Sequence, residues 1–192
     1  MTKIYLIRHG VVENPSDILY GSLPGFHLSK KGIDQVQNLS RKLKVLNPDP
    51  CLIISSPLER AQETALIISR TFGGIQIRTD NRLGEWGMGK WVGKPLQDFY
   101  RNSGYYDPEM KMENLESLDQ AADRAIAVIR ELALECENKT SFIVSHRETM
   151  AAALIKLMQK NWPEIHTLNL PTASAWELIF DHDKFLSAEF KF

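Results

Sequence analysis

The chain has 192 residues, of which 43% are hydrophobic and 24% are charged. This composition is typical of a soluble globular protein, and the length predicts one domain with a core that needs no disulfide or metal. Its 11 glycines and 9 prolines exclude a collagen-like or low-complexity chain. The formal net charge of −1 offers no global field to nucleic acid or an anionic membrane, so we expect neither as a partner.

The first part of the chain alternates short apolar runs with helical patterns. Residues 3–7 (KIYLI) predict a buried strand, and Ser29 is expected to cap a helix over about residues 30–46. A second strand is predicted at residues 52–54, a helix from Ser56 to about residue 70, and a third strand at residues 75–78. The buried face of the helix over residues 30–46 is expected to contain Ile33, Val36, Leu39 and Leu43.

The second part repeats this alternation after an irregular stretch. Residues 80–115 are rich in Gly and Trp and predict a small cap or lid, with a short helix near residues 95–101. Ser117 and Gln120 form a capping-box pattern for a helix that ends near Cys136. The remaining predicted elements are a strand at 141–144, a helix over about 148–159, and two strands at 175–180 and 185–190. This order predicts an α/β fold with a mostly parallel sheet and helices on both faces.

The two cysteines and the first residues bear on location. Cys51 and Cys136 each lie in an apolar run, so we expect buried free thiols. The opening MTKIYLIRHG contains too short an apolar run for a signal peptide. No stretch of the sequence approaches the ~18–20 apolar residues of a membrane span. We therefore expect a cytoplasmic protein.

Polar residues follow three of the predicted parallel strands. They are Arg8-His9 after the first strand, residues 55–60 after the second, and Ser145-His146 after the fourth. Because ligands of open α/β sheets bind beyond the carboxyl ends of the strands, these segments are expected to meet in one crevice. Arg side chains bind phosphate oxygens in pairs, and a neutral His can attack phosphorus. The crevice therefore suits phosphoryl transfer without a metal.

Four motifs in this order resemble the histidine phosphatase superfamily and its phosphoglycerate mutase-like fold. They are RHG after the first strand, SSPLERAQETA, LGEWGMGKWVG and VSHRE. The resemblance extends from residue 3 to about residue 150. It implies one domain over residues 1–192, a three-layer α/β/α sandwich, a phosphohistidine intermediate and no metal or other cofactor.

The resemblance assigns roles to individual residues. His9 would be the nucleophile that becomes phosphorylated, Arg8 and Arg60 would hold the phosphoryl oxygens, and His146 would complete that pocket. Glu85 would protonate the leaving oxygen and later deprotonate a water. Burial in a Trp- and Gly-rich loop would raise the pKa of Glu85 toward that of a usable acid.

Three further positions are candidates for substrate binding. Asn14 resembles in type an Asn that holds phosphate, although it stands one position nearer to the histidine than in the mutases. Gly21 resembles a small residue whose backbone approaches the substrate. Arg147 stands where a small residue commonly follows the second histidine; it would either read a second acidic group of the substrate or point outward. We expect loop or surface histidines at His27, His166 and His182.

These features predict a metal-independent phosphatase that acts on a small phosphorylated metabolite. A phosphoglycerate mutase is the alternative, but it needs a closed chamber, for which residues 80–115 leave little room. A non-catalytic module that binds a phosphorylated ligand is a further alternative, which the retained histidines, arginines and acid disfavour. The sequence leaves open whether the chain forms a homodimer.

Overall fold

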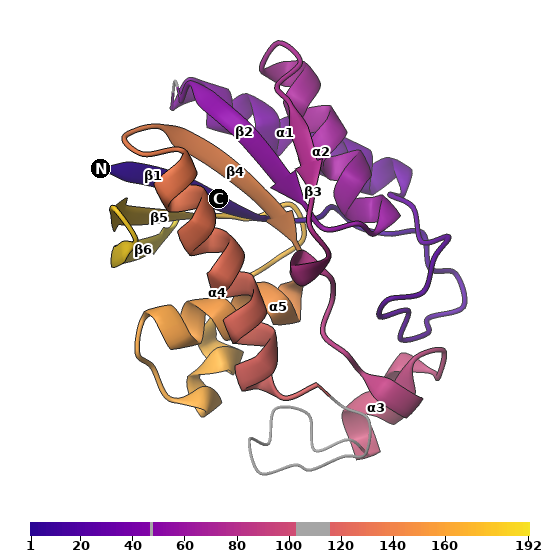
Figure 1. The fold of residues 1–192 in the computed structure, drawn as a ribbon. Helices are drawn as coiled ribbons and strands as arrows, with labels where there is room; N and C mark the ends of the chain where they lie inside the picture. Colours follow the sequence, from indigo (N-terminus) through magenta and orange to yellow (C-terminus); the bar gives the residue numbers. More distant parts are fainter. Residues whose placement is uncertain (47, 103–115) are drawn as a thin grey trace.

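The computed structural model describes residues 1–46, 48–102 and 116–192. They form a six-stranded sheet in the order β3-β2-β4-β1-β5-β6, covered by helices on both faces (Figure 1). Neighbouring strands from β3 to β1 are parallel, whereas β5 and β6 run antiparallel to their neighbours. The predicted α/β class with a mostly parallel sheet is therefore confirmed. The strands are β1 (Thr2–Arg8), β2 (Pro50–Ser55), β3 (Ile77–Thr79), β4 (Thr140–Ser145), β5 (Ala175–Asp181) and β6 (Lys184–Phe190).

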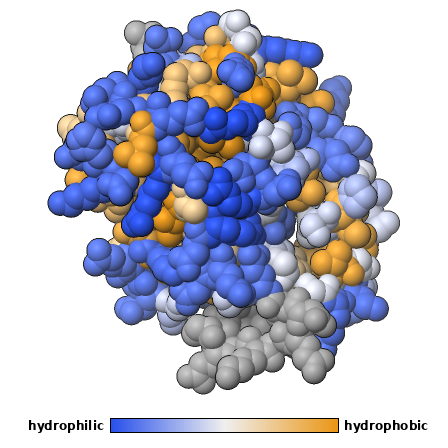
Figure 2. All heavy atoms as spheres, viewed as in Figure 1, coloured by the Kyte–Doolittle hydropathy of each residue, from blue (hydrophilic) through white to orange (hydrophobic). Residues whose placement is uncertain are grey.

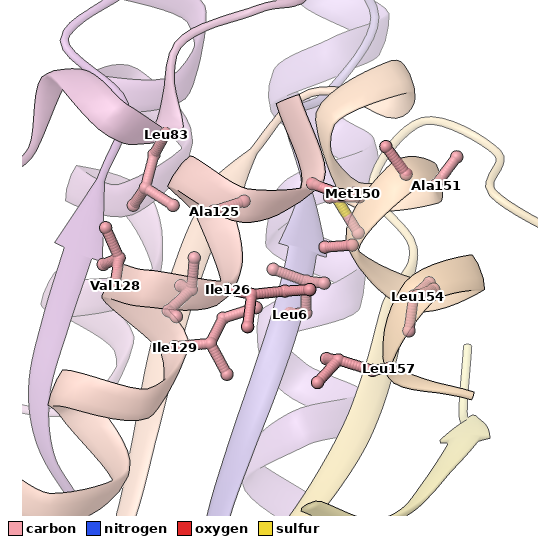
Figure 3. Packing of buried hydrophobic residues seen from close by; sticks show 14 of the residues in the cluster. Leu6, Leu83, Ala125, Ile126, Val128, Ile129, Met150, Ala151, Leu154 and Leu157 are labelled. Carbon is pink, nitrogen blue, oxygen red and sulfur yellow. The ribbon is translucent and has the colours of Figure 1, made fainter. Parts of the chain in front are cut away.

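Alternate side chains of each central strand enter opposite cores, because successive residues of a strand face opposite sides of the sheet. Tyr5 and Ile7 pack against the helices α1 (Lys30–Val45) and α2 (Glu59–Thr71). Ile4 and Leu6 lie in the other cluster, with α4 (Leu118–Glu135) and α5 (Arg147–Leu157). Figure 3 shows Leu6 beneath side chains of α4 and α5. The sheet is thus the middle layer of three.

The segment between β3 and α4 bears on the predicted cap. It contains the 3-10 helices η1 (Asn81–Leu83) and η2 (Gly89–Trp91), followed by α3 (Leu96–Asn102). The predicted short helix near residues 95–101 is confirmed. Residues 103–115 lie outside the described residues, so a cap over residues 80–115 stays a prediction.

Two predicted helix caps are confirmed and one is wrong. The hydroxyl of Ser29 accepts a hydrogen bond from the Gly32 N–H, and Ser117 and Gln120 form the predicted capping box. Ser56, in contrast, does not begin α2, which starts at Glu59. Its hydroxyl accepts the Leu58 N–H at 3.3 Å and also lies 2.7 Å from His146 Nε2, a tertiary partner that local propensity does not reveal.

Two smaller predictions also need correction. Ile33 is 38% exposed, so it is not part of the buried face of α1. The third strand covers Ile77–Thr79, two residues later than its predicted start. Gly73 and Gly74 end the turn after α2 with positive φ angles, and of the next two residues Gln76 contacts β2 through its backbone oxygen. A further 3-10 helix, η3 (Trp162–Thr167), lies between α5 and β5.

The prediction of buried free thiols is wrong. Cys51 and Cys136 form a disulfide that joins the start of β2 to the end of α4. Cys136 is buried, whereas Cys51, the second residue of β2, is exposed. Each apolar run thus places its cysteine at an element end, and the two ends meet in the fold.

The surface in Figure 2 is mainly hydrophilic, with hydrophobic residues in scattered patches. Within the described ranges, every helix falls short of the length or hydropathy needed to cross a bilayer.

Candidate active site

His9 follows β1 directly and is almost completely buried. Its Nδ1 lies 2.7 Å from the backbone oxygen of Gly10, so Nδ1 carries the proton and donates it to this carbonyl. Nε2 therefore keeps a lone pair. Burial lowers the pKa of His9 well below its ordinary value, and the charges of Arg60 and Arg8 lower it further. The imidazole is consequently neutral at neutral pH, as a nucleophile must be.

His146 follows β4, the strand that pairs in parallel with β1. The rings of His9 and His146 meet, with their centroids 5.1 Å apart. The Nε2 atom of His146 lies 2.7 Å from Ser56 Oγ. Its Nδ1 atom is buried without a hydrogen-bond partner among the described residues, 3.9 Å from Glu85 Oε2. With the Ser56 hydroxyl donating to Nε2, the proton resides on Nδ1, which can donate to an anion.

Two arginines add positive charge beside His9. Arg60, in the first turn of α2, is wholly buried; its Nη2 donates to the Gly21 oxygen at 2.6 Å, and the Tyr20 ring lies 4.7 Å from its guanidinium carbon. Arg8 donates from Nη1 to the Leu170 oxygen. The Nε atoms of both arginines and Nη1 of Arg60 are buried without a partner among the described residues. An unpaired buried donor costs about 1–3 kcal/mol, and more when it is charged, so these groups favour a bound anion.

Glu85 lies in the irregular segment between η1 and η2, with 6% of its side chain exposed. Its Oε1 accepts a hydrogen bond of 2.8 Å from the Trp86 N–H. Burial raises the pKa of Glu85 to about 8, with the charge of Glu148 as the second cause and Arg60 as an opposing one. Its carboxyl group therefore holds a proton at neutral pH and can act as an acid.

A cavity of about 150 Å³ opens beside these groups. Its polar lining comes from Arg8, His9, Gly21, Glu85, Arg147 and Glu148. Its apolar lining comes from Ile18, Leu19, Met88, Leu96 and Phe99, with Tyr20 and Tyr100 between the two. The cavity is thus lined by a neutral imidazole, the Arg8 guanidinium and a protonated carboxyl group. Arg60 and His146 are not among its lining residues, although the His146 ring and the Arg60 charge both lie beside His9.

The three candidate substrate residues are placed differently. Gly21 lines the cavity and adopts a φ of +45°, in the left-handed region that glycine favours. Arg147 also lines it, with Nη1 3.1 Å from Glu148 Oε1. Asn14 is not brought to this cavity: its side chain donates to the Ile18 oxygen at 2.9 Å and closes its own loop. The three remaining histidines are exposed at positions His27, His166 and His182.

Three residues beside the site were not predicted to have a role there. Tyr20 covers Arg60, Ser56 orients His146, and Glu148 shares the cavity with Glu85. Glu148 had a sequence signal, since it directly follows Arg147 in VSHRE. Tyr20 had no such signal in the sequence, because its position depends on the path of a long loop. Among the described residues, no three His, Cys, Asp or Glu side chains gather as a metal ion would require.

The whole chain was also compared with known protein families, sequences and structures. The model of the histidine phosphatase superfamily (branch 1) matches residues 4–191. An uncharacterized protein of Mycobacterium tuberculosis is 48% identical over 79 residues, which cover 41% of this chain and only 38% of that protein. The adenosylcobalamin/alpha-ribazole phosphatase of Escherichia coli is 26% identical over 190 residues, covering 93% of this chain and 85% of the relative. The structure of phosphoserine phosphatase from Entamoeba histolytica in complex with 3-phosphoglyceric acid has a TM-score of 0.82 and 25% identity, covering 99% of this chain and 96% of its own.

Proposed function

The chain belongs to the histidine phosphatase superfamily, and on this premise we propose that it hydrolyses a phosphomonoester through a phosphohistidine on His9. The observation that carries the proposal is the set of buried donors of Arg8, Arg60 and His146 that lack partners in the described structure. They lie around the imidazole of His9, whose Nδ1 is hydrogen-bonded to the backbone oxygen of Gly10. A phosphoryl group would satisfy these donors and face Nε2 of His9.

In the first step, the Nε2 lone pair of His9 attacks phosphorus in line with the leaving oxygen. The N–P bond forms while the P–O bond breaks, and Glu85 transfers its proton to the leaving oxygen. The guanidinium groups of Arg8 and Arg60 and the Nδ1–H of His146 stabilise the charge on the phosphoryl oxygens.

In the second step, the Glu85 carboxylate takes a proton from a water molecule. The water oxygen attacks phosphorus, the N–P bond breaks, and inorganic phosphate leaves. His9 is then neutral and Glu85 is protonated, so the cycle is closed without an external acid or metal ion.

The substrate proposed is a small phosphorylated metabolite. Relatives carry names of this kind: adenosylcobalamin/alpha-ribazole phosphatase, putative phosphoserine phosphatase and glucosyl-3-phosphoglycerate phosphatase. Arg147 at the cavity supports an ester whose leaving group carries a second acidic group.

The test compares wild type with His9→Ala on 4-nitrophenyl phosphate and a panel of phosphorylated metabolites. We expect phosphate release by wild type, and an acid-labile, base-stable phosphoryl label on the wild-type chain that is absent from His9→Ala. His27→Ala is the matched control, because the His27 side chain is 59% exposed. A wild type as inert as His9→Ala on all substrates would favour a binding module, and isomerisation of 3-phosphoglycerate outpacing phosphate release would identify a mutase.

A further inference from the structure

Glu85 lies just after η1, and one side chain of α4 binds three carbonyl groups of η1 and the residues that follow it. Arg124 Nη1 donates to the backbone oxygens of Arg82 at 2.6 Å and Gly84 at 2.8 Å. Its Nη2 donates to the backbone oxygen of Glu85 at 3.2 Å. Because the guanidinium group is planar and rigid, these bonds restrain both the position and the orientation of the segment.

Glu116 holds the other end of the same segment. Its carboxylate pairs with Arg124 through both oxygens, and Oε2 also accepts the Gly87 N–H at 3.0 Å. The backbone of Glu116 donates to the Gly87 oxygen at 3.1 Å and accepts the indole N–H of Trp86 at 2.7 Å. A Cβ on Gly87 would lie only 3.0 Å from the Cβ of Glu116, so a larger residue at this position would press on Glu116.

Helix α5 provides a third connection. Thr149 Oγ1 donates to the Gly84 oxygen at 2.8 Å, next to the bond from Arg124. His146 is the N-cap of the same helix. The backbone just before Glu85 is therefore fixed relative to α5, the helix that begins directly after His146.

We propose that Arg124 is a positioning residue, which sets the Glu85 carboxyl at the leaving-group oxygen and so controls proton transfer in the first step. This inference rests on the proposed function. Arg124 donates to the backbone of the segment and does not line the cavity, so its effect on the reaction passes through Glu85. Misplacing a proton donor by about 1 Å can cost on the order of 100-fold in rate.

The dependence of kcat/KM on the leaving group distinguishes a misplaced Glu85 from a general distortion of the candidate site. A 4-nitrophenolate leaves with little help from an acid, whereas an alkoxide needs a proton. We expect Arg124→Lys to lower kcat/KM for glycerol 2-phosphate by about 10–100-fold, and that for 4-nitrophenyl phosphate by less than about threefold. Arg130→Lys, an exposed arginine of the same helix, is the control and should change neither value.

A double variant tests whether the effect passes through Glu85. In a Glu85→Gln background, Arg124→Lys should cause no further loss with the alkyl ester, since the proton donor is already absent. Equal losses with both esters, or additive losses in the double variant, would overturn the inference while wild-type activity still upheld the proposed function. If Arg124→Lys does not fold, Glu116→Gln weakens the same pairing, with the same pattern expected. Thermal unfolding of each variant is measured in parallel.

Discussion

Two carboxyl groups, Glu85 and Glu148, face the same cavity. The pKa of Glu85 rises to about 8 through burial and, second, through the charge of Glu148. The protonated form of Glu85, the proposed proton donor, is therefore present below about pH 8, and kcat/KM for an alkyl phosphate should fall as the pH rises through this value. Glu148→Gln removes a negative charge that opposes ionisation, so we expect the alkaline limb to move to lower pH. The measurement is kcat/KM for glycerol 2-phosphate against pH.

Glu189→Gln provides the control for that profile. The side chain of Glu189 is 70% exposed on β6, where it pairs with Lys191. Its removal should leave the alkaline limb where it is in wild type. An alkaline limb that moved to higher pH in Glu148→Gln, or moved equally in both variants, would contradict the effect of the Glu148 charge on the pKa of Glu85.

Arg147 can be tested with two substrates that differ in one charged group. 3-Phosphoglycerate carries a carboxylate where glycerol 3-phosphate carries a hydroxymethyl group. If Arg147 binds this carboxylate, Arg147→Ala should raise KM about 10–100-fold for 3-phosphoglycerate, as expected for a lost bond between charged groups. KM for glycerol 3-phosphate should stay within about twofold. Equal changes for both would show that Arg147 does not read an acidic group.

The positive charge needed at the phosphoryl oxygens is present in the chain itself. Arg8, Arg60 and His146 supply donors at the site, and phosphoryl transfer relies on such charge stabilisation. We expect the rate of phosphate release to be unchanged after dialysis against EDTA. Loss of activity that a divalent cation restores would instead show that a metal takes part.

At the scale of whole elements, the site could be predicted because it lies at strand ends. β1, β2 and β4 are parallel neighbours, so the residues after them meet at one edge of the sheet. His9 and His146 are brought together by this register alone. Such contacts require only the element order and the parallel direction, both of which hydrophobic patterns reveal.

Contacts that depend on loops could not be predicted in this way. Arg124 meets Gly84 across 40 residues of sequence, through a segment with no periodicity. Asn14 has the expected residue type, but its loop closes on Ile18. Ser56 has the pattern of an N-cap, yet α2 starts at Glu59, and the Ser56 hydroxyl contacts His146 as well as the Leu58 N–H. In each case the deciding interaction lies outside the local sequence window.

The first turn of α1 crosses the chain just after His9 at very short distance. A Cβ on Gly32 would lie 2.0 Å from the Val11 oxygen, and one on Gly10 would lie 2.7 Å from the Gly32 oxygen. Gly32→Ala gains about 1 kcal/mol of helix propensity, but the steric conflict costs about 1–3 kcal/mol or more. We expect lower stability in urea unfolding and a loss of activity, since the helix displaces the backbone next to His9.

Ile33→Ala is the matched control in the next position of α1. Ile33 is 38% exposed and lies outside both buried clusters. Its variant should keep wild-type activity and lose less stability than Gly32→Ala. If Gly32→Ala were as active as wild type, the close crossing would have no role in placing the nucleophile.

At the scale of the whole molecule, the Cys51–Cys136 disulfide joins β2 and α4 at the ends farthest along each element from the site. Ser56 follows the other end of β2, and Glu116 precedes the other end of α4. The bridge spans a sequence separation of 85 residues, and closing a loop of this length typically stabilises a protein by about 2–4 kcal/mol. It also removes one premise of the predicted cytoplasmic location, because stable disulfides are rare in reducing compartments.

Reduction of this bridge should therefore separate stability from activity. With a reductant present, we expect the free energy of unfolding in urea to fall by about 2–4 kcal/mol. We expect kcat/KM to be unchanged at room temperature, because the candidate site lies at the opposite ends of the strands. A Cys51→Ser, Cys136→Ser double variant should match the reduced protein and ignore the reductant. Two thiols that titrate in the untreated, unfolded chain would contradict the bridge. A fall in kcat/KM while the reduced protein stays folded would show instead that the bridge at the amino end of β2 controls the geometry around His9.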